Sequence, residues 1–197
     1  MDTRKKSKKQ TIFTIGHSTR TLDELVELLR AHGVHRVIDI RTIPRSRHNP
    51  QYNRETLGPA LRSRKIGYVH LKGLGGLRRS EPNSRNLGWH NASFRGFADY
   101  MQTPGFEAAL RRAIELSKDK PSALMCAEAV PWRCHRSLVA DSLAASKFRV
   151  DHIMSVTRAN QHKLTSFARV RGKKVTYPSD RPVRRKPPVR RSKQPSK

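Results

Sequence analysis

Short apolar runs alternate with amphipathic segments along most of this chain, and that alternation limits the possible fold more than any other feature. Strands that are apolar along their whole length, with helices between them, are typical of a mostly parallel sheet covered on both faces. The sequence therefore predicts a three-layer α/β fold. The runs with the length and the β-branched residues of buried strands are 11–16 (TIFTIG), 37–41 (VIDIR), 68–71 (YVHL), 122–128 (SALMCAE) and 150–154 (VDHIM).

The segments between these runs carry helix signals. The clearest follows the first run, where Thr21 and Glu24 form a capping box ahead of an apolar stripe and Gly33 closes the end. Residues 167–177 predict a small hairpin around Gly172. Further helices are predicted at 55–65, 93–102, 104–118 and 134–146.

The charge balance lies far from zero, at a formal net +27. Residues 181–197 carry eight Lys or Arg and no acid, and residues 1–10 carry a net +4, which leaves +15 on residues 11–180. We expect one α/β domain over 11–178, a basic arm before it and a basic, Pro- and Arg-rich disordered tail at 179–197.

A basic body with basic arms predicts a polyanionic partner, because each neutralised phosphate releases counterions and adds affinity. Nucleic acid is the first candidate. The alternative is a soluble protein with an extensive solvated charge surface.

No segment has the pattern of an export or membrane signal. The N-terminus, MDTRKKSKKQ, is charged but leads into too few apolar residues for a signal peptide. No run approaches the roughly 20 apolar residues that a membrane span needs. Two cysteines argue against a disulfide framework and favour a reducing compartment. We therefore expect a cytoplasmic protein without a membrane partner.

Polar and cationic residues follow four of the predicted strands. In an open parallel sheet, ligands bind beyond the carboxyl ends of the strands, so these loops predict one basic cleft. The candidates for contact with a substrate or anion are Ser18, Arg41, Ser46, Arg47, Lys72, Gly75, Gly76, Arg133 and Arg136.

The loop after the fourth strand is the richest in reactive groups. Backbone N–H groups at the start of the predicted helix, beside Arg133 and Arg136, would form an anion pocket. The same positive end would lower the pKa of Cys134 and make it a nucleophile, whereas the alternative is an inert helix cap. Cys126 is equally well explained as a small buried apolar residue. The candidate catalytic residues are Cys134, His135, Glu128 and His17.

His135 or His17 would carry the proton, and Glu128 would act as general base or hold an arginine. Asp39 lies inside an apolar strand, where an unpaired charge would be costly. We expect it to pair with Arg41, with Arg47 or with a helix N-terminus.

Several known motifs are approached but not met. A phosphatase loop needs five residues between cysteine and arginine, and six separate Cys126 from Arg133. The zinc-deaminase pattern is matched only loosely, without its second cysteine pair. A zinc site of Cys126, Cys134 and His135 would use two adjacent ligands, which we expect to be strained, so no metal is predicted. The loop KGLGG (72–76) fits a glycine-rich turn as well as a phosphate cradle.

Five ordered motifs resemble domain-of-unknown-function family 488 over about residues 11–178. They are TIGHST (14–19), DIRTIPRSR (39–47), YVHLKGLGG (68–76), MCAEAVPWRCHR (125–136) and KLTSFARVRGKKVTYP (163–178). The resemblance implies an α/β domain but names no reaction and no cofactor. The signature residues that it implies are His17, Ser18, Asp39, Arg41, Pro44, Ser46, Glu128, Cys134, His135 and Arg136.

Two classes of function remain open on this basis. One is a protein that binds a phosphate-bearing ligand, nucleotide or nucleic acid, in the strand-end cleft and processes it through Cys, His, Glu and Arg side chains. The other is a non-catalytic nucleic-acid-binding module, favoured by the +15 body and the basic arms. The sequence does not decide between them, and it leaves the oligomeric state open.

Overall fold

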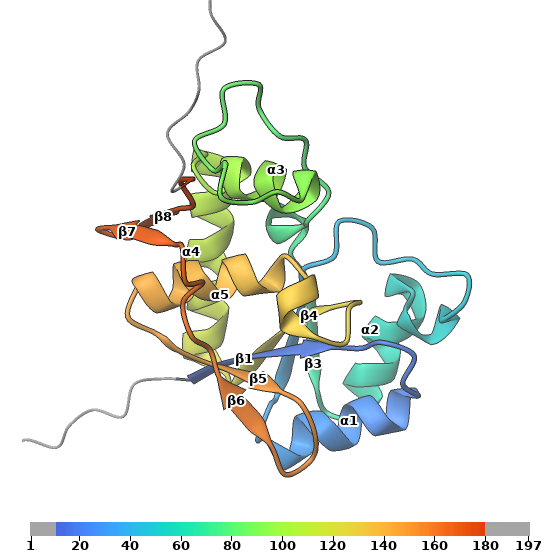
Figure 1. The fold of residues 1–197 in the computed structure, drawn as a ribbon. Coiled ribbons are helices and arrows are strands. Elements are labelled where there is room, and N and C mark those ends of the chain that lie inside the picture. Colours follow the sequence, from blue (N-terminus) through green and yellow to red (C-terminus); the bar gives the residue numbers. More distant parts are fainter. Residues whose placement is uncertain (1–10, 180–197) are drawn as a thin grey trace, which may run out of the picture.

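The computed structural model describes residues 11–179. At its centre lies a six-stranded sheet with the order β3-β2-β4-β1-β5-β6 (Figure 1). Within this sheet all strands are parallel except β6, which pairs antiparallel with β5 at one edge. The predicted mostly parallel α/β fold is confirmed. The strands are β1 (Thr11–Gly16), β2 (Arg36–Asp39), β3 (Gly67–His70), β4 (Ser122–Cys126), β5 (Arg149–Ile153) and β6 (Ala159–Gln161).

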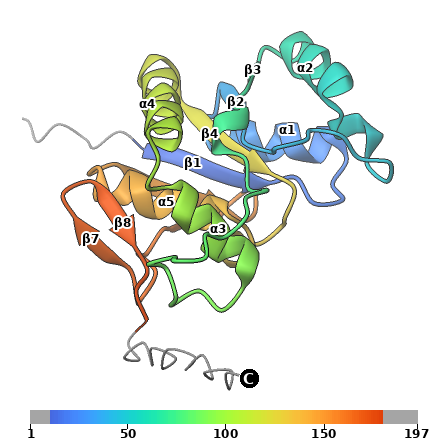
Figure 2. The ribbon, with the colours of Figure 1, turned by 90° about the horizontal axis from the view of Figure 1, so that it is seen from above.

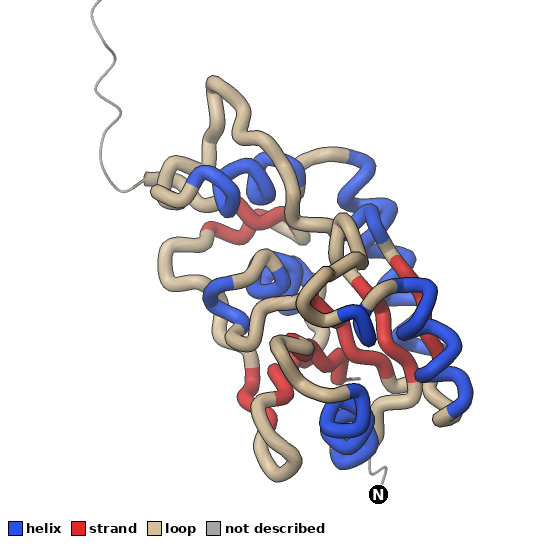
Figure 3. The backbone as a smooth tube through the Cα atoms, turned by 90° about the vertical axis from the view of Figure 1, so that its right-hand side faces the viewer, coloured by secondary structure: helices blue, strands red, loops and turns tan. Residues whose placement is uncertain are grey.

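Helices cover both faces of this sheet. Helices α1 and α2 lie on one face and α3, α4 and α5 on the other (Figures 2 and 3). Each layer packs on the sheet with its own apolar core. The predicted arm at 1–10 and all of the predicted tail except residue 179 lie outside the described residues. The helices are α1 (Leu22–Ala31), α2 (Arg54–Ser63), α3 (Ala92–Tyr100), α4 (Pro104–Asp119) and α5 (Arg136–Ala145).

Helix α1 begins as its sequence predicts. The Thr21 side chain accepts a hydrogen bond from the Glu24 backbone N–H, and the Glu24 carboxylate accepts one from the Thr21 N–H at 2.6 Å. Gly33 follows the helix with φ +66°, a left-handed conformation that glycine adopts without steric cost. Local chemistry therefore sets both ends of the helix that follows β1.

The C-terminal part of the domain folds back onto α5. Strands β7 (Arg169–Arg171) and β8 (Lys174–Thr176) form the predicted hairpin, turning at Gly172 with φ +61°. The fully buried Asp141 of α5 accepts a hydrogen bond from the Tyr177 hydroxyl at 2.7 Å and one from His162 Nε2 at 2.8 Å. A buried carboxylate is stable only when it is hydrogen-bonded in this way, so Asp141 fastens this segment to the core.

The strand order places a crevice between β1 and β4. These strands are neighbours, but the helix after β1 packs on one face of the sheet and the helix after β4 on the other. Such a reversal opens a crevice at the carboxyl ends of the strands, where ligands of open α/β sheets bind. In residues 11–179 no helix is both long and apolar enough to cross a membrane.

Candidate functional site

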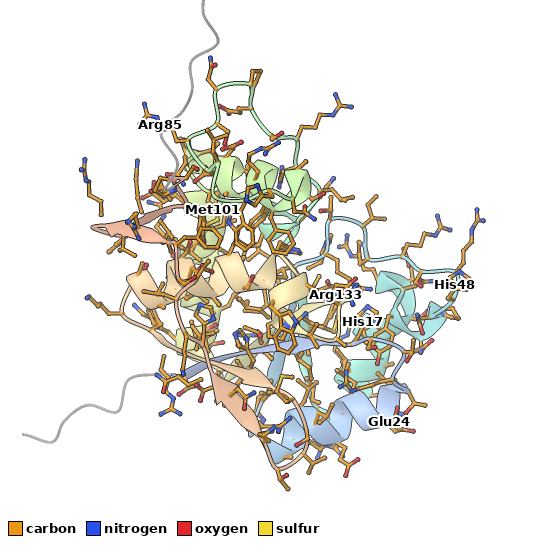
Figure 4. The ribbon with its side chains drawn as sticks, in the orientation of Figure 1. His17, Glu24, His48, Arg85, Met101 and Arg133 are labelled. Carbon is orange, nitrogen blue, oxygen red and sulfur yellow. The ribbon has the colours of Figure 1, made fainter. Side chains whose placement is uncertain are left out.

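A cavity of about 390 Å³ lies at the carboxyl ends of β1, β2 and β4. This volume falls within the range of small-molecule sites. Figure 4 shows His17 beyond the end of β1, beside the loops that follow β2 and β4. The structure thus brings five of the predicted site residues to one cavity. Its lining residues are His17, Ser18, Thr19, Arg41, Ile43, Arg45, Ser46, Asn49, Ala127, Glu128 and Ala129.

A buried ion pair lies beside the cavity, and its arginine, Arg41, lines the cavity. Arg41 Nε and Nη2 donate to the two carboxylate oxygens of Asp39 at 2.9 and 2.6 Å, and the Tyr68 hydroxyl donates to Asp39 at 2.8 Å. Asp39 is fully buried and Arg41 is 6 % exposed. The predicted pairing of Asp39 with Arg41 is confirmed. A fork held by two parallel hydrogen bonds has one orientation, which leaves Nη1 of Arg41 to face His17.

His17 is held as one tautomer. Its Nδ1 lies 2.7 Å from the Ser18 carbonyl oxygen and therefore carries the proton, while Nε2 accepts from Arg41 Nη1 at 3.3 Å. The ring stacks on Tyr52 with 3.9 Å between the ring centroids. Burial, with the Arg41 charge adding to it, lowers the pKa of His17 to about 4. His17 is therefore a neutral imidazole at pH 7, with Nε2 as an acceptor.

The loop after β1 is hydrogen-bonded through its backbone to the end of β4 and to the residue that follows it, next to the cavity. The backbone N–H groups of His17 and Ser18 donate to the carbonyls of Cys126 and Ala127 at 2.9 and 2.8 Å. A Cβ added to Gly16 would lie 1.7 Å from the Glu128 carbonyl oxygen, so only glycine fits here. Ser18 has φ +53°, an uncommon conformation for a residue with a side chain. Backbone outliers of this kind cluster at functional sites.

Arg136 contacts the backbone of two residues that line the cavity. It is 1 % exposed, and its guanidinium donates to the backbone carbonyls of Glu128 and, at 2.7 Å, of Ala129. Arg136 therefore positions the Glu128 loop, and its role as an anion contact stays a prediction. Arg47 and Arg133 are exposed and do not line the cavity.

The glycine loop after β3 packs against its neighbours. A Cβ on Gly75 would lie 2.4 Å from Thr42 Oγ1, and one on Gly76 would lie 2.4 Å from His135 Nδ1. Lys72 opens the short 3₁₀ turn that leads into this loop. None of the three lines the cavity, so their predicted contact with an anion stays untested.

The two cysteines and His135 form a separate cluster on the α5 side of the sheet. His135 Nδ1 lies 3.9 Å from Cys126 Sγ and 3.8 Å from Cys134 Sγ. A hydrogen bond from the Cys126 thiol, with His135 and Arg136 adding to it, lowers the pKa of Cys134, the direction expected from its sequence position. The same bond raises the pKa of Cys126. Cys134 is 3 % exposed, and no member of the cluster lines the cavity.

Some of these site residues were absent from the candidates named by sequence. Arg45 falls inside the motif DIRTIPRSR and could have been included on that ground. Tyr52, in a 3₁₀ turn, stacks on the ring of His17 and orients it. Tyr68, in β3, donates a hydrogen bond to Asp39 and orients its carboxylate. Neither tyrosine carries a motif, because its role depends on a contact between segments far apart in sequence.

The family model for the domain of unknown function DUF488 matches residues 21–143. This chain belongs to the DUF488 family. The matched range contains the Asp39–Arg41 pair, Glu128 and the cysteine cluster, whereas His17 precedes it. Neither the search of curated proteins nor that of solved structures returned a match. DUF488 membership confirms the resemblance found in the sequence, and it assigns no ligand and no reaction.

Proposed function

We propose that this DUF488 protein binds a phosphate-bearing ligand, a nucleotide or a nucleic acid, in the strand-end cavity and processes it there. The observation that supports this most is the convergence of His17, Arg41, Arg45 and two serine side chains at the point where the sheet connections reverse direction. Guanidinium and hydroxyl groups are the donors that phosphate oxygens accept best in proteins.

Arg45 is the cation that we assign to the ligand. The charge of Arg41 is balanced by Asp39, whereas Arg45 is exposed at the cavity and makes no ion pair within residues 11–179. The excess of +15 on the body adds a long-range field that draws anions toward the molecule.

Proton transfer is assigned to His17 and Glu128. A phosphate oxygen that accepts from Arg41 Nη1 would release His17 Nε2, which lies 3.3 Å from that nitrogen, to take a proton from water or a ligand hydroxyl. Glu128 lines the same cavity and is exposed, so we assign its carboxylate to orienting that group. Cys134 is buried away from the cavity, and its predicted role as a nucleophile is not needed for this step.

Calorimetric titration with nucleoside mono- and diphosphates, an oligonucleotide and the matching unphosphorylated nucleosides tests the proposal. We expect only the phosphate-bearing compounds to bind. Arg45→Ala should weaken their binding by at least about tenfold, because a charge-assisted hydrogen bond contributes about 1.5–3 kcal/mol. The matched control is Arg112→Ala, which removes an exposed arginine of α4 that is ion-paired with Glu115. Equal binding of nucleosides, or equal losses in the two variants, would rule the proposal out.

A specific observation also supports the non-catalytic nucleic-acid module. The β7–β8 hairpin exposes several cations beside a second groove of about 950 Å³. If this face is the binding site, oligonucleotide affinity should fall in Arg171→Ala/Lys174→Ala, with a shallower salt dependence, and stay unchanged in Arg45→Ala. The opposite pattern supports the cavity. The exposed cations of the hairpin are Arg169, Arg171, Lys173 and Lys174.

A further inference from the structure

Two cysteine sulfurs and one histidine nitrogen, all metal-ligating atoms, converge beside the N-terminus of α5. They are Cys126 Sγ at the end of β4, Cys134 Sγ and His135 Nδ1, and all lie within 4.8 Å of one another. The proposed cavity chemistry uses none of them. Cys134 and His135 are adjacent in sequence, yet their ligand atoms point to the same place. Residues 131–133 form a 3₁₀ turn, and Cys134 after it is extended, with φ −136° and ψ 141°. The strain expected for neighbouring ligands is absent from this arrangement.

The spacing agrees with a tetrahedral zinc site. Bonds of about 2.3 Å to sulfur and about 2.0–2.1 Å to nitrogen place two tetrahedral sulfur ligands about 3.8 Å apart, and sulfur and nitrogen about 3.6 Å apart. The measured separations from His135 Nδ1 are 3.8 Å to Cys134 Sγ and 3.9 Å to Cys126 Sγ. Both separations lie within about 0.3 Å of the sulfur–nitrogen value, and the two sulfurs lie no more than 4.8 Å apart, against about 3.8 Å around a bound ion.

The surroundings orient the ligands as in metal sites. His135 Nε2 lies 3.2 Å from the Ile40 carbonyl oxygen, which can only accept, so the proton is on Nε2 and the Nδ1 lone pair faces the two sulfurs. A carbonyl partner on the remote nitrogen is the usual second-shell contact of a metal-bound histidine. The Arg136 backbone N–H also points at Cys134 Sγ, at 3.5 Å, which stabilises a thiolate there.

We propose that Cys126, Cys134 and His135 bind one Zn²⁺ ion through both Sγ atoms and Nδ1, leaving a fourth position for water or a ligand atom. Two thiolates neutralise the ion, and this donor set selects zinc over Mg²⁺, Ca²⁺ and Mn²⁺. Three protein ligands with an open fourth position are typical of catalytic rather than structural zinc. The site goes beyond the proposed phosphate-binding function, and either can fail without the other.

Metal content and a cobalt spectrum test this site in the full chain, purified under reducing conditions without chelators. We expect native mass spectrometry to find one zinc per chain. Apo protein titrated with Co²⁺ should develop the thiolate-to-cobalt charge-transfer band and the intense visible bands of a tetrahedral ion. Cys126→Ser, Cys134→Ser and His135→Ala should each weaken zinc binding more than the about 10–100-fold that loss of an outer-shell partner causes. His90→Ala, which removes an exposed histidine, should bind as wild type does.

A second measurement on the wild-type chain keeps the test valid if a variant fails to fold. Zinc at 100 times its dissociation constant should slow iodoacetamide alkylation of the two cysteines about 100-fold, because binding depletes the open state, whereas Mg²⁺ should not. Reduced wild-type protein that takes up neither zinc nor cobalt, or zinc binding unchanged in folded Cys134→Ser, would overturn the proposal. Oxidation of the cysteines to a disulfide in protein that binds no metal would overturn it equally.

Discussion

Replacing Asp39 by alanine is expected to lower the free energy of unfolding by about 3–5 kcal/mol, because the change leaves a buried guanidinium without its counter-ion. Asp39 is fully buried and accepts from the backbone N–H, Nε and Nη2 of Arg41 and from the Tyr68 hydroxyl. Without the carboxylate, the Arg41 guanidinium keeps, within residues 11–179, only its hydrogen bonds with the Tyr52 carbonyl oxygen and His17. Urea unfolding followed by circular dichroism measures the change.

Asp119 provides the matched control for Asp39. It also pairs with one arginine, Arg36, at 2.7 Å, but its side chain is 62 % exposed. A pair with an exposed carboxylate contributes little, and Arg36, whose side chain is 13 % exposed, keeps its hydrogen bond to the Leu116 carbonyl oxygen at 2.6 Å when Asp119 is removed. Asp119→Ala should therefore unfold at the same urea concentration as wild type. Equal effects of the two substitutions would show that Asp39 and Arg41 are not the buried pair described above.

Gly16→Ala is expected to be the second most damaging change, with a loss of about 3 kcal/mol or more. Overpacking costs about 1–3 kcal/mol where side chains can adjust, and more where they cannot. Here the new Cβ would lie 1.7 Å from the Glu128 carbonyl oxygen, a backbone atom that cannot rotate away. The ends of β1 and β4 would have to separate, which would also break the bond from the His17 N–H to the Cys126 carbonyl oxygen.

Gly67→Ala is the control for this substitution. Gly67 lies in β3, and an added Cβ would meet nothing closer than 3.6 Å, which is ordinary van der Waals contact. We expect its urea midpoint to stay near that of wild type, while that of Gly16→Ala falls sharply. A Gly16→Ala protein as stable as Gly67→Ala would contradict the close junction between the ends of β1 and β4.

Much of the fold could be predicted because its signals are local. The capping box of α1 and the apolar run of β1 each act over a few residues, and the structure contains both elements at the expected places. The predicted ends of strands and helices agree less well with the structure. The strand predicted for 122–128 ends at Cys126, and the helix predicted from 134 begins at Arg136, because a 3₁₀ turn at Pro131–Arg133 lies between them. Strand β6 was missed, since it is a three-residue edge strand with little apolar character.

The candidate site could be predicted only in outline. That the strand ends would gather His17, Arg41 and Glu128 follows from the rules of parallel sheets, and these residues line one cavity. The face of the sheet toward which each strand residue points depends on the position of that residue along the strand. Along β4, Met125 packs with the α1 and α2 core and Cys126 with the opposite core, so the cysteine cluster is separated from the cavity. No sequence signal distinguished these two faces.

The most direct test of the central claim is an amide NMR titration of the full chain with adenosine 5′-monophosphate and, separately, with inorganic phosphate. If the strand-end cavity is the ligand site, the largest chemical-shift changes should fall on the amides of 17–19, 41–49 and 127–129. Residues 169–176 of the hairpin should change little. Saturating shifts confined to the hairpin, or no shift anywhere with either compound, would contradict a phosphate-binding site in the cavity.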